Sequence, residues 1–304
     1  LLSQLPPSIQ SVVTLHCVRP AQFALRGEIE ETYVQTLAQR ADRVIVHLPS
    51  QKGILQRLGI PPSKIQVIPH GTRKWHIEKA AARQHIGIPP SKKLLLMFGF
   101  IKRHKNCHVA LETVAKIREK ESNVLFYLAG SLAPNPKPTD VAYLHEIQQK
   151  IQDLDLERHV IFPNQFCPTH ELPFLLSAAD VVLLPYSEES RAASGVLHDA
   201  IGSLTPVVAS RIPKFEELKN ISDELLVLPC NVDSIARVTL RLLHDDIFSH
   251  YIRQRMKLYR QRTLWEKVAH RHIMLYLKLF MGLEAEGIDK QHLSYLSLKE
   301  DGLV

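Results

Sequence analysis

VVLLPYSEESRAASGVLHDAIGSLTPVVAS, the stretch from residue 181 to residue 210, decides the fold that this sequence predicts. Two apolar runs in it, 181–184 and 206–209, are too short for helices and rich in Val and Leu, so they are typical of buried strands in a parallel sheet. Residues 194–203 between them have the length of one crossover helix. The stretch therefore predicts the repeating unit of an α/β sheet, in which a strand is followed by a loop, a helix and a second strand.

The start of this helix carries a candidate anion site. Ser194 and Gly195 stand where the helix begins, and a glycine there lets an anionic group approach backbone N–H groups at the end where the helix dipole favours negative charge. Asp199 lies four residues after Gly195 on the same face, and could accept hydrogen bonds from the hydroxyl pair of a sugar. Ordinary helix capping explains the Ser-Gly pair equally well, so the rest of the chain has to decide between the two interpretations.

The alternation of strands and helices extends in both directions from this stretch. Strands are predicted at 94–98, 124–128, 160–162, 181–184, 207–209 and 225–228, and helices at 107–120, 139–153, 170–177, 195–203, 214–219 and 231–244. Six strands with intervening helices predict a Rossmann-like parallel sheet. Gly99 and Gly130 end two of the strands, where a glycine allows the close approach of a ligand or simply forms a tight turn. The sequence has neither a Gly-x-Gly-x-x-Gly fingerprint nor a P-loop, which disfavours dehydrogenases and P-loop nucleotidases.

The region before residue 73 repeats the pattern on a smaller scale. Strands are predicted at 11–15, 43–47 and 65–68, and helices at 28–41, 50–58 and 75–85. Three strands are too few for a complete doubly wound sheet, so we expect a first domain that is truncated at its amino end. The expected parts are a partial first Rossmann-like domain at 1–72, a linker at 73–92, a second Rossmann-like domain at 93–262, a crossover helix at 263–280 and a tail at 281–304.

The composition limits the classes of partner. The chain has 304 residues, 45% of them hydrophobic, and a formal net charge of +7. This excess of positive charge suits an anionic ligand, an acidic membrane surface or nucleic acid, and a solvated basic surface explains it equally well. The densest basic run is Lys102-Arg103-His104-Lys105. Basic and aromatic residues are not interleaved as they are in nucleic-acid stacking platforms, so we expect no nucleic-acid partner.

The four cysteines favour a reducing compartment. Cys17, Cys107, Cys167 and Cys230 are far apart, so neither a disulfide framework nor a zinc site is indicated. No apolar run reaches the length of a membrane span. We therefore expect a cytoplasmic protein, with peripheral contact to the inner membrane face left open.

A series of short motifs along the chain matches a known family in order and spacing. The motifs are Val13-Thr14-Leu15-His16, Ala41-Asp42-Arg43-Val44-Ile45-Val46, Ile68-Pro69-His70-Gly71, Gly99 with Lys105-Asn106, Phe126-Tyr127-Leu128-Ala129-Gly130, Val160-Ile161-Phe162, Ala179-Asp180-Val181 and Pro206-Val207-Val208-Ala209. In these motifs the chain resembles the retaining glycosyltransferases of family four, over about residues 12–280 and most strongly over residues 94–210. The resemblance implies the GT-B fold, an α/β fold in which two Rossmann-like domains face each other across a cleft.

The resemblance also implies roles for two basic residues and a histidine. Lys105 matches the family lysine that binds the donor diphosphate, and an ammonium group is a suitable point charge for phosphate oxygens. Phe100 stands where the family often has a further basic residue, and Arg103 is the candidate to replace it because a guanidinium grips two oxygens at once. His16 matches the family histidine that approaches the transferred sugar. His16, Lys105 and Arg103 are therefore the candidate catalytic residues.

Other residues match the donor-binding positions of the family. Asp199 falls where the family usually has a glutamate that bonds the ribose hydroxyls. An acidic residue is expected eight positions earlier, but Arg191 stands there, and Glu188 or Glu189 could take its place. This departure leaves open an alternative function, a nucleotide-sugar-binding protein with impaired catalysis. The candidate donor-binding residues are Gly99, Gly130, Gln165, Phe166, Glu188, Glu189, Ser194, Gly195, Val196, Leu197 and Asp199.

The function that the resemblance implies is transfer of a hexose from a nucleoside diphosphate sugar to an acceptor hydroxyl, with retention, in polysaccharide or glycolipid synthesis. A UDP-sugar is expected before a GDP-sugar only because UDP-sugars are the more frequent donors. The acceptor is expected to be a sugar or a lipid-linked sugar. No metal or other cofactor is expected, because fixed positive charge would neutralise the leaving group. Asp153-Leu154-Asp155 matches the metal-binding Asp-x-Asp of the other glycosyltransferase fold, but it ends a predicted helix, where acidic residues are usually solvated.

Overall fold

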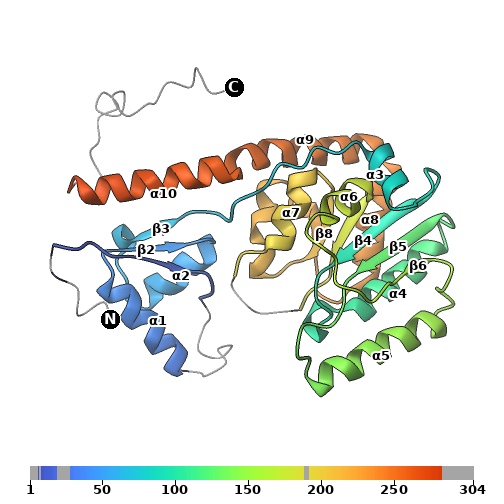
Figure 1. The fold of residues 1–304 in the computed structure, drawn as a ribbon, viewed down its shortest axis with the longest axis horizontal. Coiled ribbons are helices and arrows are strands. Elements are labelled where there is room, and N and C mark those ends of the chain that lie inside the picture. Colours follow the sequence, from blue (N-terminus) through green and yellow to red (C-terminus); the bar gives the residue numbers. More distant parts are fainter. Residues whose placement is uncertain (1–5, 7, 19–27, 188–191, 283–304) are drawn as a thin grey trace. The chain divides into compact units, whose positions relative to one another are not determined.

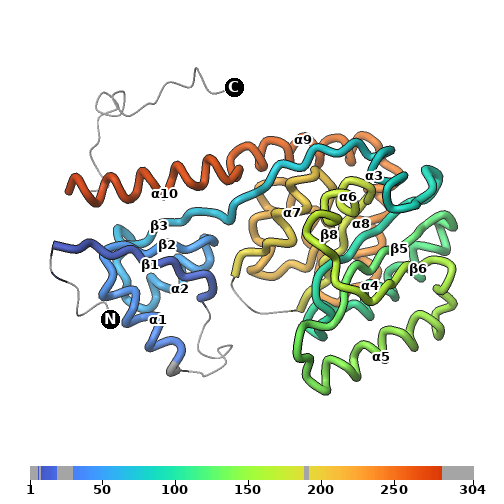
Figure 2. The backbone as a smooth tube through the Cα atoms, in the orientation of Figure 1, coloured from blue at the N-terminus to red at the C-terminus, as the bar shows by residue number. Residues whose placement is uncertain are grey.

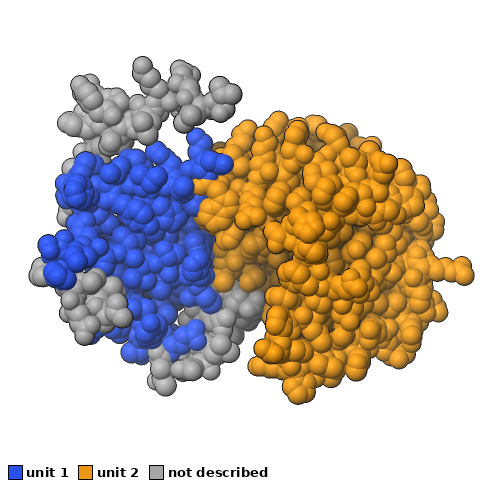
Figure 3. Space-filling model, in the orientation of Figure 1, with its two compact units in different colours: residues 1–68, 266–304 blue, residues 69–265 orange. Residues whose placement is uncertain are grey.

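The computed structural model describes residues 6, 8–18, 28–187 and 192–282. The chain forms two compact units, which have separate colours in Figure 3. Unit 1 comprises residues 1–68 and 266–304, and unit 2 comprises residues 69–265. The chain therefore passes between the units after residue 68 and again after residue 265.

Unit 1 contains a three-stranded parallel sheet in the order β1-β2-β3 (Figure 1). Its strands are β1 (Val12–Leu15), β2 (Arg43–Val46) and β3 (Ile65–Val67), and its helices are α1 (Glu28–Arg40), α2 (Pro49–Arg57) and α10 (Trp265–Phe280), which begins at the last residue of unit 2. Side chains of β2 alternate between two cores. Val44 and Val46 pack in a core with α2, whereas Ile45 packs in a second core with α10. The middle strand is therefore covered on both faces, which explains its unbroken apolar sequence.

Unit 2 contains a six-stranded parallel sheet in the order β6-β5-β4-β7-β8-β9. Its strands are β4 (Lys93–Phe98), β5 (Val124–Ala129), β6 (Val160–Ile161), β7 (Val181–Leu184), β8 (Val207–Ser210) and β9 (Leu226–Val227). Its helices are α3 (Lys79–His85), α4 (Cys107–Arg118), α5 (Pro138–Asp153), α6 (Leu172–Ala178), α7 (Gly195–Ser203), α8 (Val232–His244) and α9 (Asp246–Thr263). The predicted Rossmann-like parallel sheet is confirmed, and all four residues of β7 are fully buried in it.

The order of the strands in unit 2 marks where a ligand is expected to bind. From β4 the chain proceeds through β5 to β6 in one direction, then returns to β7 and proceeds through β8 to β9 in the other. Figure 2 shows β5 and β6 on one side of this sheet and β8 on the other. The reversal lies between β4 and β7, which are neighbours in the middle of the sheet. Open parallel sheets bind ligands at the carboxyl ends of the strands beside such a reversal.

Two elements of unit 2 differ from the sequence prediction. The helix predicted at 75–85 begins only at Lys79, because the N–H group of Trp75 donates to the carbonyl of Gly202 at 3.2 Å and ties this part of the chain to α7. The helix predicted at 214–219 is a 3-10 helix, Pro213–Asn220. Both differences lie in segments whose conformation is set by contacts with distant parts of the chain or by a proline at the first turn.

The helical region after Asp246 is interrupted at Leu264. Thr72 pairs with the backbone there: its N–H group donates to the carbonyl of Thr263 at 2.7 Å, and its carbonyl accepts from the N–H group of Trp265 at 3.3 Å. These bonds replace helical ones, so α9 ends and α10 begins at this point.

The division into units also differs in detail from the expected domain boundaries. Residues 73–92, expected to form a linker, lie within unit 2 and include α3, whose Ala82 belongs to the core of that unit. Residues 281 and 282 of the expected tail form a turn, and the remainder of the tail lies outside the described residues.

Candidate functional site

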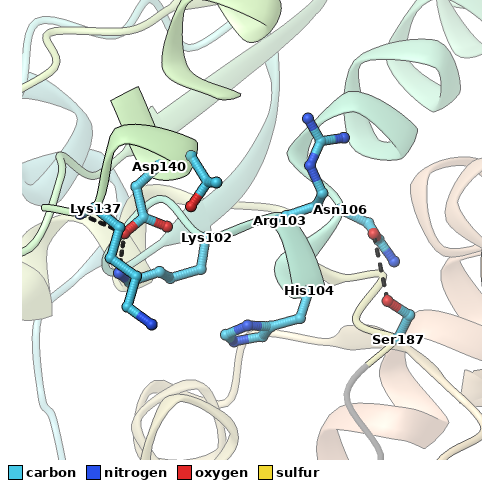
Figure 4. A pocket seen from close by; sticks show the side chains of 8 residues that line it. Lys102, Arg103, His104, Asn106, Lys137, Asp140 and Ser187 are labelled. Carbon is cyan, nitrogen blue, oxygen red and sulfur yellow. Dashed lines mark hydrogen bonds and ion pairs between the residues drawn. The ribbon is translucent and has the colours of Figure 1, made fainter. Parts of the chain in front are cut away.

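A cavity of about 560 Å³ opens at the carboxyl ends of β4 and β7 (Figure 4). It is lined by Lys102, Arg103, His104, Asn106, Lys137, Thr139, Asp140 and Ser187. Hydrogen bonds join the loops that follow the two strands: the N–H group of Ser187 donates to the carbonyl of His104 at 2.9 Å, and Nδ2 of Asn106 donates to the carbonyl of Pro185 at 2.8 Å. The cavity therefore lies at the reversal of strand order, where the topology predicts a ligand.

Basic side chains outnumber acidic ones in this cavity. Lys102 Nζ donates to Asp140 at 2.6 Å, and this bond is the main cause of the lowered pKa of the Asp140 carboxyl. Figure 4 shows Arg103 pointing to the other side, away from Lys137. Its guanidinium pairs with Glu146 of α5 and lies 4.5 Å from the centre of the Tyr143 ring. Arg103, predicted from the resemblance to contact a diphosphate, is thus bonded to α5 in this structure.

Lys105 lies between the ends of the two central strands. Its Nζ would be 2.8 Å from a Cβ placed on Gly99, so the glycine leaves the room that the ammonium group occupies. Gly99 also has a φ of +99°, which other residues rarely adopt. A Cβ on Gly130 would in turn lie 2.2 Å from the carbonyl oxygen of Gly99. On the other side, Nζ of Lys105 is 5.7 Å from the ring of Tyr186, which follows β7.

The helix predicted at 195–203 is confirmed as α7, and its first turn is capped by Ser194. The buried Oγ of Ser194 accepts a hydrogen bond from the N–H group of Leu197 at 3.2 Å. Leu197 itself is fully buried, so this residue can reach a ligand only through its backbone. Gly195 and Val196 precede it at the mouth of the helix, where the dipole favours an anion.

Asp199 lies one turn into α7 and is half-buried. Burial raises the pKa of its carboxyl to about 6, against the opposing effect of the positive charges of Arg73 and His198. Its charge therefore changes close to neutral pH, which is a common property of groups in functional sites.

Gln165 and Phe166 line a second cavity in unit 2, of about 240 Å³. It lies at the ends of β5 and β6, since Ala129 and Pro163 also line it. Phe166 is 65% exposed, and the centre of its ring is 6.2 Å from that of Phe100. The rings of Phe166 and Phe100 thus lie close together beside this cavity, and Phe100 occupies the position where the family often has a basic residue.

His16 lies in unit 1, just after the carboxyl end of β1. Nδ1 of His47 donates to the carbonyl of Ile68 at 2.9 Å, so Nε2 of a neutral His47 accepts from Nδ1 of His16 at 3.1 Å. The backbone carbonyl of His16 accepts from Nε2 of Gln51 at 2.9 Å. When both rings are neutral, these bonds hold the ring of His16 in the tautomer that has its acceptor at Nε2.

The remaining predictions concern three residues of the stretch before α7 and the expectation that no metal is bound. Glu188, Glu189 and Arg191 lie outside the described residues. Among the residues that the structure describes, no three or more His, Cys, Asp or Glu side chains are grouped as a metal would require. In the same part of the chain, no helix combines the length and the apolar character that crossing a membrane demands.

Several residues near these features were not among the predicted site residues. Lys102, His104 and Lys137 line the larger cavity, and His70 and His198 lie close to the start of α7. A signal existed for some of them. His70 closely follows a strand, as His16 does, and Lys102 and His104 belong to the densest basic run. No local pattern marks His198, which became apparent only from its buried partners.

Comparison with known proteins gives consistent matches. Residues 78–259 match the family model described as glycosyl transferases group 1. The 2-deoxystreptamine glucosyltransferase of Streptomyces kanamyceticus is 25% identical over 248 residues, which are 77% of this chain and 61% of that protein. The uncharacterized glycosyltransferase MJ1607 of Methanocaldococcus jannaschii is 27% identical over 226 residues, 71% of this chain and 54% of that protein. The chain thus spans less than two thirds of the length of either relative.

Solved structures show the same fold. Anabaena HepE in complex with UDP has a TM-score of 0.75 at 18% identity, covering 88% of this chain and 72% of that one. Sucrose-phosphate synthase from Thermosynechococcus elongatus has a TM-score of 0.74 at 25% identity, covering 92% of this chain and 70% of that one. The predicted α/β fold class, with Rossmann-like parallel sheets of the GT-B type, is confirmed.

Proposed function

The chain belongs to the glycosyl transferases group 1 family, and from this premise we propose that it transfers a hexose from a nucleoside diphosphate sugar to an acceptor hydroxyl. We propose retention of the anomeric configuration, as the family-four motifs imply, and a UDP-sugar as the first donor to test. A solved structure with the same fold holds UDP, which supports that order of testing. The acceptor is proposed to be a sugar or a lipid-linked sugar of polysaccharide or glycolipid synthesis.

One observation carries the proposal. The ammonium group of Lys105 and the mouth of α7 lie at the same end of one sheet, because β4 and β7 are neighbours and the loops after them are hydrogen-bonded to each other. A diphosphate needs such a combination of fixed positive charge and backbone N–H donors.

The arrangement suits the difficult step of the reaction. Cleavage of the glycosidic bond to phosphate separates an oxocarbenium-like sugar from a departing diphosphate. Lys105 and the amides at the start of α7 are already oriented, so they would stabilise the charge that develops on the leaving group. Asp199 would accept hydrogen bonds from the ribose, and the cavity at Phe166 would receive the base. In this proposal no metal is required, and the role of His16 stays a prediction from the resemblance.

Calorimetry with free nucleotides and nucleotide sugars tests the proposal directly. The purified protein is titrated with UDP, GDP, UDP-glucose and UDP-N-acetylglucosamine, each in EDTA and in Mg²⁺. We expect binding of at least one nucleotide and its sugar form, with similar affinity in both buffers. Transfer to a sugar acceptor is then followed by mass spectrometry. A protein that binds none of these compounds would contradict the proposed function, and binding only in Mg²⁺ would contradict metal independence.

The alternative is a nucleotide-sugar-binding protein with impaired catalysis, and the observation that favours it is Arg191 at a position where the family has an acid. The same titrations separate the two functions when they are combined with an activity assay. Donor binding without hydrolysis or transfer, unchanged by Arg191→Glu, supports the alternative. Activity that appears or rises in Arg191→Glu would show that the machinery is otherwise complete.

A further inference from the structure

His70 lies at the mouth of α7. Its Nε2 would be 3.9 Å from a Cβ placed on Gly195, which is an ordinary contact distance. A group bound to the first amides of the helix would therefore meet the imidazole ring of His70 as well. No role for this side chain follows from the sequence motifs or from the proposed binding of the diphosphate.

The ring of His70 is held in place on three sides. Its Nδ1 donates to the carbonyl of Gly71 at 2.8 Å. The centre of its ring is 5.6 Å from the nearest ring centre of Trp265 and 5.0 Å from that of His198. A Cβ on Gly71 would lie 2.1 Å from the indole of Trp265, so only glycine at this position leaves room for that ring. His70 is thus oriented before any ligand arrives.

His198 is fixed by a chain of hydrogen bonds whose directions can be assigned. Oγ1 of Thr263 donates to the carbonyl of Tyr259 at 3.1 Å, so it accepts from Oγ1 of Thr72 at 2.8 Å. Thr72 in turn accepts from Nδ1 of His198 at 2.7 Å. The other ring nitrogen, Nε2, lies 3.2 Å from the carboxylate of Glu217. Both nitrogens of His198 are therefore donors, and the ring is a buried imidazolium paired with a buried carboxylate.

The chemistry at Nε2 of His70 follows from these assignments. Because Nδ1 carries the proton that is donated to Gly71, Nε2 of the neutral ring is an acceptor. The mouth of α7 thus combines amide donors with one imidazole acceptor. A phosphate oxygen only accepts, so the amides suit the diphosphate. The imidazole acceptor instead suits a hydroxyl next to it, because a hydroxyl can donate.

We propose that His70 accepts a hydrogen bond from a hydroxyl of the transferred sugar, and that it therefore discriminates among sugars without contributing to nucleotide binding. This role rests on the proposed function. It adds to the donor site a side chain of unit 2 that contacts the sugar itself.

The experiment compares free UDP with a UDP-sugar in two variants of His70. Wild type, His70→Ala and His70→Gln are titrated with UDP and with the UDP-sugar that wild type binds most tightly. We expect His70→Ala to raise the Kd of the UDP-sugar about tenfold, as for the loss of one neutral hydrogen bond. The Kd of UDP should stay unchanged within about twofold. His70→Gln keeps an acceptor and should recover part of the loss. His244→Ala, a histidine paired with Glu121 away from the site, is the matched control.

Deoxyfluoro donors identify the hydroxyl. Fluorine cannot donate a hydrogen bond, so replacing the hydroxyl that His70 binds should weaken binding to wild type and cause no further loss in His70→Ala. An equal loss of affinity for UDP and for the UDP-sugar in His70→Ala would overturn the proposal. The ring would then contribute to nucleotide binding or to the conformation of α7. Unchanged UDP-sugar binding in that variant would also overturn it. A wild type that binds UDP but no UDP-sugar would overturn the proposed function together with it.

Discussion

At the scale of the residue, the proposed role of the Asp199 carboxyl predicts that donor binding depends on pH. Its pKa is raised to about 6 by burial, and only the ionised form can accept two hydrogen bonds from a ribose. We expect the affinity for UDP to be constant above about pH 7 and to fall as the pH drops through about 6. Calorimetry over that range measures the effect. Asp199→Asn should bind UDP weakly and with no such dependence, and a dependence that persists in this variant would belong to another group.

The same residue affects the stability of the free protein. Because the pKa of this carboxyl is raised from 3.8 to about 6 on folding, the unfolded chain loses its proton first as the pH rises. The folded protein therefore loses stability between about pH 4 and pH 6, and the full cost is present above that window. Asp199→Asn should therefore stabilise the ligand-free protein at pH 8, by on the order of 2 kcal/mol after allowance for partial exposure. The difference should disappear near pH 4. Urea unfolding at both pH values measures it, and a variant less stable at pH 8 would contradict the assigned burial effect.

Lys105 is expected to contribute charge to nucleotide binding. If Lys105 holds the diphosphate as proposed, Lys105→Ala removes a charge-assisted contact, and the Kd for UDP should rise roughly thirtyfold, or about 2 kcal/mol. Lys120→Ala, an exposed lysine after α4, is the control and should leave the Kd unchanged. An unaltered Kd in Lys105→Ala would remove this residue from the site.

At the scale of the element, α7 is limited by what packs against its last turn. A Cβ on Gly202 would lie 2.2 Å from the carbonyl oxygen of Arg73, and the carbonyl of Gly202 accepts from Trp75 and from Arg260. Gly202→Ala should lower stability by about 1–3 kcal/mol despite the better helix propensity of alanine, because backbone would have to move.

Gly53→Ala in α2 is the control for Gly202→Ala, because it also replaces a glycine inside a helix. A Cβ there would meet only the side-chain nitrogen of Arg57, at 3.7 Å. Gly53→Ala should therefore raise stability by about 0.5–1 kcal/mol. Thermal and urea unfolding of both variants measure the contrast. If both alanines stabilise the protein, the packing assigned to the end of α7 is wrong.

Local sequence patterns were sufficient to predict most helices and strands. They did not predict the places where hydrogen bonds to distant segments replace those within a helix. The short Val- and Leu-rich runs predicted β7 and β8, and the length of residues 194–203 predicted α7. The first turn of the helix predicted at 75–85 is absent because Trp75 bonds to Gly202, a contact across more than a hundred residues. The same holds for the candidate site. The basic run and the Ser-Gly pair could be recognised in the sequence, whereas the charged ring of His198 depends on its contact with Glu217, which no local pattern predicts.

At the scale of the whole molecule, the buried pair of His198 and Glu217 links the fold to pH. Burial opposes ionisation of Glu217, but the charge of His198 and the hydrogen bonds from His198 and Tyr259 outweigh it and lower its pKa. A carboxyl with a lowered folded pKa adds stability above its ordinary pKa, and this stability is lost as the pH falls through the folded value.

Glu217→Gln tests this contribution. The substitution leaves the charged ring of His198 buried without its partner, so stability at neutral pH should fall by about 3 kcal/mol. The difference from wild type should shrink in acid, where wild type also loses the charge. Glu119→Gln, an exposed residue after α4, is the control for urea unfolding at both pH values. An equal deficit at neutral and acid pH would mean that the charge of Glu217 contributes nothing.

Pairing between the start and the end of unit 2 could not be predicted from the sequence. Thr72 and Thr263 are 191 positions apart, and their side chains are 2.8 Å apart. Periodicity and spacing describe neighbours along the chain, so they contain no signal for such a contact. The structure places the unit boundaries after Ile68 and after Trp265. Both threonines therefore lie close to the points where the chain passes from one unit to the other.

The bridge between Thr72 and Leu264 has a consequence for engineering. Because residues 69–265 form one uninterrupted stretch with its two ends fastened side by side, this stretch has the layout of an exchangeable cassette. The corresponding stretch of a related protein could be exchanged for it at these two junctions, because the chain enters and leaves the stretch only once.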